Sequence, residues 1–267
     1  MATRGLGHAV SISEPTLFVQ LLELHCHVAV WSVVNLVARR WLASHLRTRP
    51  WIVPTVLREI ERYRSALGLH QTFDQALDCY AHWWLVGVQH SLGCILIAPA
   101  VFGIGDKDFQ LATLRHGTLC ELACELADTL DRLHRRFFVP GGHRVESNAV
   151  LLMMALHHAA SLSMTIPLNL RYSGNEHYQQ IVWHCQSAAA FAVLATNYAQ
   201  TLDTSNPWEL LQMQVSSVAV LVITGYQRLV LCVTLQHRLI QDMKAEGDHD
   251  LATLGLGVSV LLLGFNL

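Results

Sequence analysis

Two adjacent histidines, His157 and His158, lie in the middle of a long apolar stretch, and Ser161, Ser163 and Thr165 follow them. Near neutral pH a histidine can act as a general base, a general acid or a metal ligand. Adjacent positions on a helix point about 100° apart, so one ligand position cannot use both side chains equally. We expect one imidazole to face a cavity and the other to bond a neighbouring helix.

Three carboxylates, Glu121, Glu125 and Asp128, form the second group of side chains that could do chemistry. Their spacing of four and then three residues places them on one face of a helix. Three ionised carboxylates on one face repel each other, so a cation, a proton or Arg and His partners must offset their charge. Two interpretations stay open: a polar site inside a helix bundle, or a helix that lies on a surface and is partly exposed.

Other catalytic and cofactor motifs are absent from the sequence. There is no histidine box of the HxxxH or HxxHH type, and no GxSxG, P-loop or GxGxxG motif, so neither a metal nor a cofactor is predicted. The seven cysteines include no CxxC pair and mostly lie in apolar stretches, which favours reduced, buried thiols over a disulfide framework.

The composition indicates a protein that is solvated by lipid. Hydrophobic residues make up 52% of the 267 residues, charged residues only 14%, and the mean hydropathy is +0.32. A soluble domain carries about 25% charged residues, and a surface with far fewer would expose large apolar patches. The formal charge of −2 gives no sign of a nucleic-acid partner. We therefore predict an all-α, polytopic transmembrane helix bundle.

Windows of about 20 apolar residues predict about seven spans, with a range of six to eight. The third window is poor because it holds the three carboxylates, and the last is barely long enough to cross. The predicted spans are 17–38, 81–103, 111–130, 149–170, 178–202, 210–235 and 251–267. The expected organisation is an N-terminal segment 1–16, a bundle over 17–235, and a polar linker with a short final helix over 236–267.

The loops predict an orientation for this bundle. Arginines gather in the connector 39–75 and in the stretch 132–144, whereas the other loops are poor in basic residues. Basic loops stay in the cytosol, so both regions are expected there and the N-terminus is expected outside or in a lumen. Within the connector, an apolar face beside Arg58, Arg62 and Arg64 is typical of an interfacial helix.

The stretch from His90 to Arg228 resembles the TLC family of membrane proteins, the TRAM, LAG and CLN8 group. The resemblance rests on an early span with a His, on the acidic helix CELACELADTLDRLHRRF, on ALHHAASLSMTIPLNL, and on a later helix that ends TNYAQTLD. It implies a bundle of about seven helices around a lipid-accessible cavity, in an endomembrane such as the endoplasmic reticulum. His157 and His158 match the family's His pair, and Asp128 matches an acid of the preceding helix.

Two classes of function follow as hypotheses. In the first, the protein handles or senses lipids, and as an acyl-transfer enzyme it would use His157 or His158 as the general base, with Glu125 or Asp128 orienting the histidine. In the second it is a non-enzymatic transporter, receptor or membrane-complex subunit, and the acidic face is a proton or cation site or a docking surface. A scaffold that only satisfies interhelical hydrogen bonds is the third alternative. The expected partners are membrane lipids, with a homo-oligomer or a larger membrane complex left open.

Overall fold

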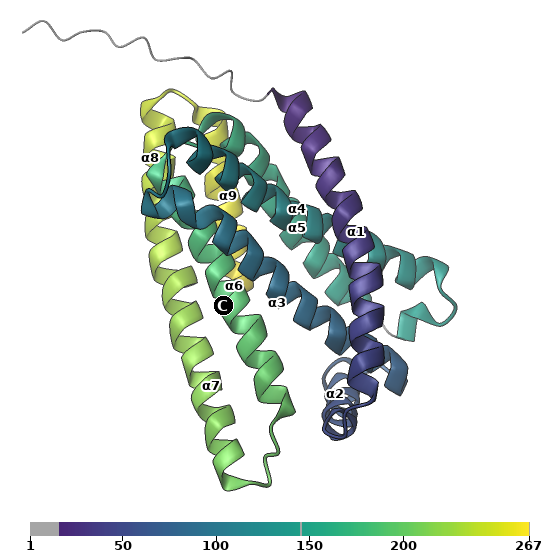
Figure 1. Ribbon diagram of the computed structural model, residues 1–267. Helices are drawn as coiled ribbons and strands as arrows, with labels where there is room; N and C mark the ends of the chain where they lie inside the picture. The colour runs from purple at the N-terminus through teal and green to yellow at the C-terminus, as the bar shows by residue number, and fades with distance from the viewer. Residues whose placement is uncertain (1–15, 145, 267) are drawn as a thin grey trace, which may run out of the picture.

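Long helices make up almost the whole of the computed structural model, which describes residues 16–144 and 146–266 (Figure 1). The described residues contain no β-strand, so the predicted all-α class is confirmed. The helices are α1 (Leu17–Arg47), α2 (Ile52–Leu67), α3 (Phe73–Phe102), α4 (Lys107–Phe138), α5 (Asn148–Arg171), α6 (Glu176–Thr201), α7 (Pro207–Gly225), α8 (Cys232–Ala245) and α9 (His249–Asn266). A 3-10 turn η1 (Gly142–Arg144) precedes α5, and a π-helical turn η2 (Tyr226–Leu231) joins α7 to α8.

Four helical units in the described part of the chain are long and apolar enough to cross a membrane. They are α1, α3, α5 and the continuous helix Pro207–Ala245 that contains α7, η2 and α8. These units correspond to four of the seven predicted spans. Helices α4 and α6 are as long but more polar, and the apolar part of α9, His249–Leu261, is shorter.

Contacts between helix ends show that the long helices alternate in direction. The end of α1 meets the start of α3, where Arg39 Nε lies 3.1 Å from an oxygen of Asp78. The end of α5 meets the start of α6, where the Tyr178 hydroxyl donates to Asn169 over 2.7 Å. At the opposite end of α6, the backbone oxygen of Gln200 accepts a hydrogen bond from Arg58 of α2 over 2.9 Å. The two arginine-rich regions therefore lie at the same end of the bundle (Figure 1).

Helix α3 runs through the centre and packs most extensively against α4 and α6. Gly93 and Gly117 allow the close approach of α3 and α4, because a Cβ on Gly117 would lie 3.1 Å from the Gly93 carbonyl oxygen. The buried side chain of Gln186 enters this crossing from α6 and donates to the Gly117 carbonyl over 3.4 Å. Small residues with one buried amide thus hold three helices together.

The predicted basic connector contains the amphipathic helix α2. Its inner face buries Ile52 and Val56 in a cluster with Leu77 and Tyr80 of α3. Burial also raises the pKa of Glu59, although the neighbouring Arg62 lowers it. The arginines of α2 lie on its exposed face, as expected of a helix at an interface.

The C-terminal region differs from the predicted organisation. A polar linker was expected from residue 236, but the helix continues through Ala245 because its charged residues face outward while Leu239, Ile240 and Met243 face the core. Helix α9 then folds back and packs against α8 and α5, with Gly255 beside Met164 and Met243. The last apolar stretch is therefore a part of the bundle.

Candidate functional site

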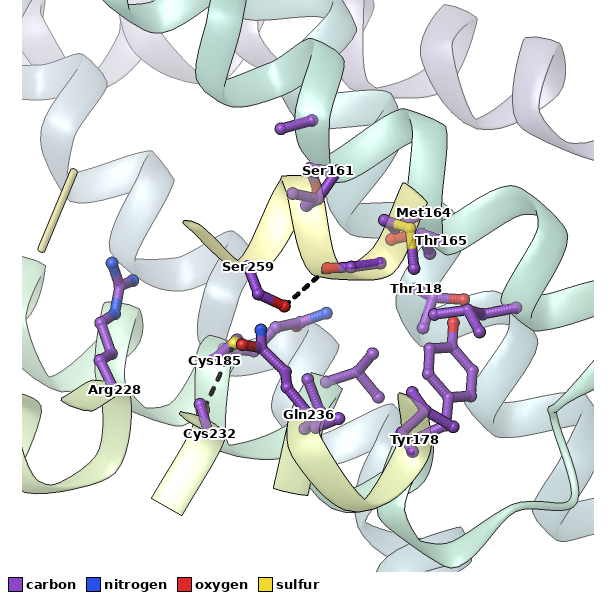
Figure 2. A pocket seen from close by; sticks show the side chains of 18 of the residues that line it. Thr118, Ser161, Met164, Thr165, Tyr178, Cys185, Arg228, Cys232, Gln236 and Ser259 are labelled. Carbon is purple, nitrogen blue, oxygen red and sulfur yellow. Dashed lines mark hydrogen bonds between the residues drawn. The ribbon is translucent and has the colours of Figure 1, made fainter. Parts of the chain in front are cut away.

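A cavity of about 230 Å³ lies inside the bundle (Figure 2). Its walls come from α4, α5, α6, α8 and α9, with single side chains from α3 and η2. The histidines, carboxylates and arginine of the lining are His90, Glu121, Glu125, His157 and Arg228, and uncharged polar side chains such as Thr118, Thr165, Gln236 and Ser259 are spread over the lining. Another part is apolar and belongs to the largest core cluster, which includes Leu168, Ile181, Leu239, Ile240 and Met243.

The polar and apolar parts are separated along the helices. His157 and Arg228 lie about three to four helical turns before Leu168 of α5 and before Leu239, Ile240 and Met243 of α8, and α5 and the η2–α8 unit run in the same direction. In Figure 2, Arg228 and Tyr178 accordingly lie at opposite ends of the view. The cavity thus has an end with charged side chains and a more apolar end, and this arrangement suits an amphipathic molecule.

The two carboxylates at the polar end differ in their partners. Gln89 Nε2 donates to Glu121 Oε2 over 2.5 Å, and His90 Nδ1 lies 2.9 Å from the same oxygen. Glu125 Oε2 is buried and has no hydrogen-bond partner among the described residues. A buried carboxylate oxygen without a partner is costly, so a proton or a ligand group would stabilise it.

The two histidines diverge as helical geometry predicts. His157 lines the cavity. His158 is buried against α4, and its Nδ1 lies 2.6 Å from the Thr129 hydroxyl. Because Thr129 donates its hydrogen to the Glu125 carbonyl oxygen over 2.9 Å, the Nδ1–H group of His158 must be the donor to Thr129.

Asp128 lies away from the cavity in a network of charges. Its Oδ1 is 3.1 Å from His82 Nε2, and its Oδ2 accepts a hydrogen bond from Arg132 Nε over 2.7 Å. Arg132 also contacts Glu146, just before α5, over 3.3 Å. The pairing joins α3, α4 and the loop before α5, and buried charges need such partners.

Of the four residues proposed from the sequence, Glu125 and His157 therefore line the cavity, whereas Asp128 and His158 do not. The three carboxylates were expected on one face of their helix, but only Glu121 and Glu125 line the cavity, and Asp128 does not. The reason is that α3 crosses α4 beside the third and supplies His82 as its partner.

Several lining residues were not found from the sequence. Tyr178 donates to Asn169 over 2.7 Å, and Asn169 donates to the Thr118 hydroxyl over 2.7 Å, so three helices share one buried chain of hydrogen bonds. Cys185 of α6 and Cys232 of α8 bring their sulfur atoms to 3.6 Å. No local pattern identifies these residues, because each group comes from helices that are distant in the sequence.

The π-helical turn η2 is the element that presents Arg228 to the cavity. A single π-helical turn inside a long helix widens the backbone locally and is frequent at functional sites. The only signal in the sequence is an arginine inside an apolar run, which is costly in a membrane unless it faces the interior.

Among the side chains that the structure describes, no group of three or more His, Cys, Asp or Glu residues is arranged to hold a metal ion. Comparison with family models, with curated proteins and with solved structures finds no match to this chain.

Proposed function

We propose that this protein is an integral membrane protein that holds an amphipathic lipid in the cavity. The lipid's polar group would lie beside Glu121, Glu125, His157 and Arg228, and its hydrocarbon part beside Leu168, Ile240 and Met243. The observation that carries the proposal is the separation of charged and apolar lining within one cavity of a chain with membrane-length helices.

The proposed topology has seven spans. Helices α4, α6 and α9 alternate in direction with the four apolar units, so each would cross the membrane beside them, with its polar side chains facing other helices. The resemblance to the TLC family and the arginine-rich end support an endomembrane protein with regions 39–64 and 132–144 in the cytosol.

As an enzyme, we propose that the protein transfers an acyl group to an amine or hydroxyl of a lipid. His157 is the better placed general base because it lines the cavity with Glu121, which can stabilise the imidazolium that forms. His158 would act indirectly, because its bond to Thr129 positions α5 against α4.

A non-enzymatic role remains the second proposal, and Glu125 favours it. Its buried Oε2 without a partner could carry a proton or accept a cationic group during transport. This alternative needs the carboxylates of the cavity but not a histidine base.

The test is acyl transfer in proteoliposomes that contain the purified chain, a radiolabelled long-chain acyl-CoA and a panel of long-chain amines and alcohols. We expect His157→Ala to lower turnover by about 10²-fold or more, which is typical for loss of a general base, and His158→Ala to lower it less. His134→Ala is the matched control, because His134 is exposed on α4 and does not line the cavity.

Full turnover in the His157→Ala, His158→Ala double variant would refute acyl transfer by these histidines. If the wild type binds lipid by native mass spectrometry but converts none, and uptake is lost on Glu125→Gln, the transport proposal replaces the enzyme. The absence of any bound or converted lipid would overturn both.

A further inference from the structure

Two thiols from different helices meet in the wall of the cavity. Cys185 lies in the middle of α6, and Cys232 is the first residue of α8. Their Sγ atoms are 3.6 Å apart, which is van der Waals contact, and both side chains line the cavity (Figure 2). The two cysteines are 47 positions apart in the sequence, so only the tertiary fold brings their sulfurs together.

The surroundings of the pair suit thiol chemistry. Arg228 lies on η2, about one helical turn before Cys232, and lines the same cavity. A positive side chain near a thiol favours the thiolate, which is the form that attacks an oxidant. The cavity gives a membrane-borne molecule access to sulfur atoms that are otherwise shielded, since Cys232 is only 3% exposed.

We propose that Cys185 and Cys232 form a redox-active dithiol that reduces an organic hydroperoxide entering the cavity. One thiolate attacks the peroxide oxygen, the O–O bond breaks, and a sulfenic acid and an alcohol form. The second thiol attacks the sulfenic sulfur, the disulfide forms and water leaves. The balance is two thiols and one hydroperoxide to one disulfide, one alcohol and one water.

The disulfide would covalently join α6 to α8 in the wall of the cavity. Formation brings the two Sγ atoms, already in contact at 3.6 Å, to the bonded distance of about 2.05 Å. The proposal does not rest on acyl transfer or on lipid transport, because it requires only the two sulfurs and an oxidant that can enter.

The experiment treats the purified full chain in detergent with cumene hydroperoxide and counts free thiols with a maleimide reagent. All seven cysteines are free in the structure. We expect two thiols to disappear, the intact mass to fall by two hydrogen atoms, and a peptide map to show a Cys185–Cys232 cross-link that dithiothreitol removes.

The variant Cys185→Ser should lose the cross-link, while the matched control Cys94→Ser, in α3 and outside the cavity lining, should keep it. The peptide map of the wild type decides the question even if Cys185→Ser does not fold. Seven free thiols after treatment, a cross-link between other cysteines, or oxidation of single cysteines without a cross-link would overturn the proposal.

Discussion

Some charged side chains of this protein form ion pairs with two partners at once. Arg39 of α1 lies 3.1 Å from Asp78 of α3 and 2.9 Å from Asp131 of α4, so one guanidinium joins three helices. Five donors in a planar group make arginine suited to such bridging. Asp78 is 34% and Asp131 33% exposed, so loss of either one leaves Arg39 with its other partner and costs less than breaking a fully buried pair. These ion pairs therefore hold α1, α3 and α4 together at the arginine-rich end, and this packing role requires no catalytic function.

Gly93 lies where α3 meets α6, and a single added side-chain atom should disturb this crossing. A Cβ at this position would lie 1.7 Å from Gln186 Oε1, so the amide would have to leave its place and lose its bond to the Gly117 carbonyl. We expect Gly93→Ala to lower the free energy of unfolding by about 1–3 kcal/mol, the usual cost of overpacking. Thermal unfolding of the purified protein in detergent measures this change.

The matched control is Gly257→Ala in α9, where no atom lies within 4 Å of the added Cβ. It should be neutral or slightly stabilising, because alanine favours a helix more than glycine does. Adding Gln186→Ala to Gly93→Ala should recover part of the loss. An unchanged unfolding temperature for Gly93→Ala would contradict the described crossing of α3, α4 and α6.

At the scale of the element, α2 links stability to pH through Glu59. Burial raises the pKa of this carboxyl above its ordinary value of 4.5. Between pH 4.5 and the raised value, the folded protein keeps a proton at Glu59 that the unfolded chain has lost, so the contribution of this residue to stability falls as pH rises. We expect Glu59→Gln to remove that part of the pH dependence.

The measurement compares the thermal unfolding of wild type and Glu59→Gln at pH 4 to 7 in about one-unit steps, starting below the ordinary pKa of 4.5. The variant should gain stability relative to the wild type as pH rises. Glu61→Gln, on the exposed side of the same helix, is the control. Equal pH profiles for the wild type and Glu59→Gln would refute the linkage.

The whole molecule has an exterior that water would not solvate well. Helix α7 has no buried residue, and Phe18, Trp208 and Leu221 are each 74% exposed. Such a surface is favourable in a bilayer, where apolar side chains meet lipid tails. The polar network and the cavity lie inside, which is the expected distribution for a helical membrane protein.

The arrangement predicts which segments share a side of the membrane. New cysteines at Ser65 in α2 and His143 in η1 lie at the arginine-rich end, and one at Lys107 lies at the opposite end, at the start of α4. In sealed vesicles, an impermeant maleimide should label the first two from the same side and Lys107→Cys from the other. The native chain gives the background labelling. Labelling of Ser65→Cys and Lys107→Cys from the same side would refute the alternation.

The sequence by itself determined the features that depend on neighbouring residues. Hydropathy over single windows predicted the helical class and the apolar units, and helical spacing predicted that His157 and His158 would point in different directions. The amphipathic pattern predicted α2 within its connector. Each of these follows from the local periodicity of an α-helix, which one stretch of chain contains in full.

Only the tertiary structure decided which face of each helix packs against which neighbouring helix. The pairing of Asp128 with His82, the crossing of Gly93 with Gln186 and the contact of Cys185 with Cys232 all depend on how each helix is rotated and tilted against the next. An apolar helix in lipid can turn about its axis with little change in hydropathy, because lipid tails and neighbouring helices are similarly apolar. Packing and interhelical polar contacts select one rotation, and these belong to no single segment of the sequence.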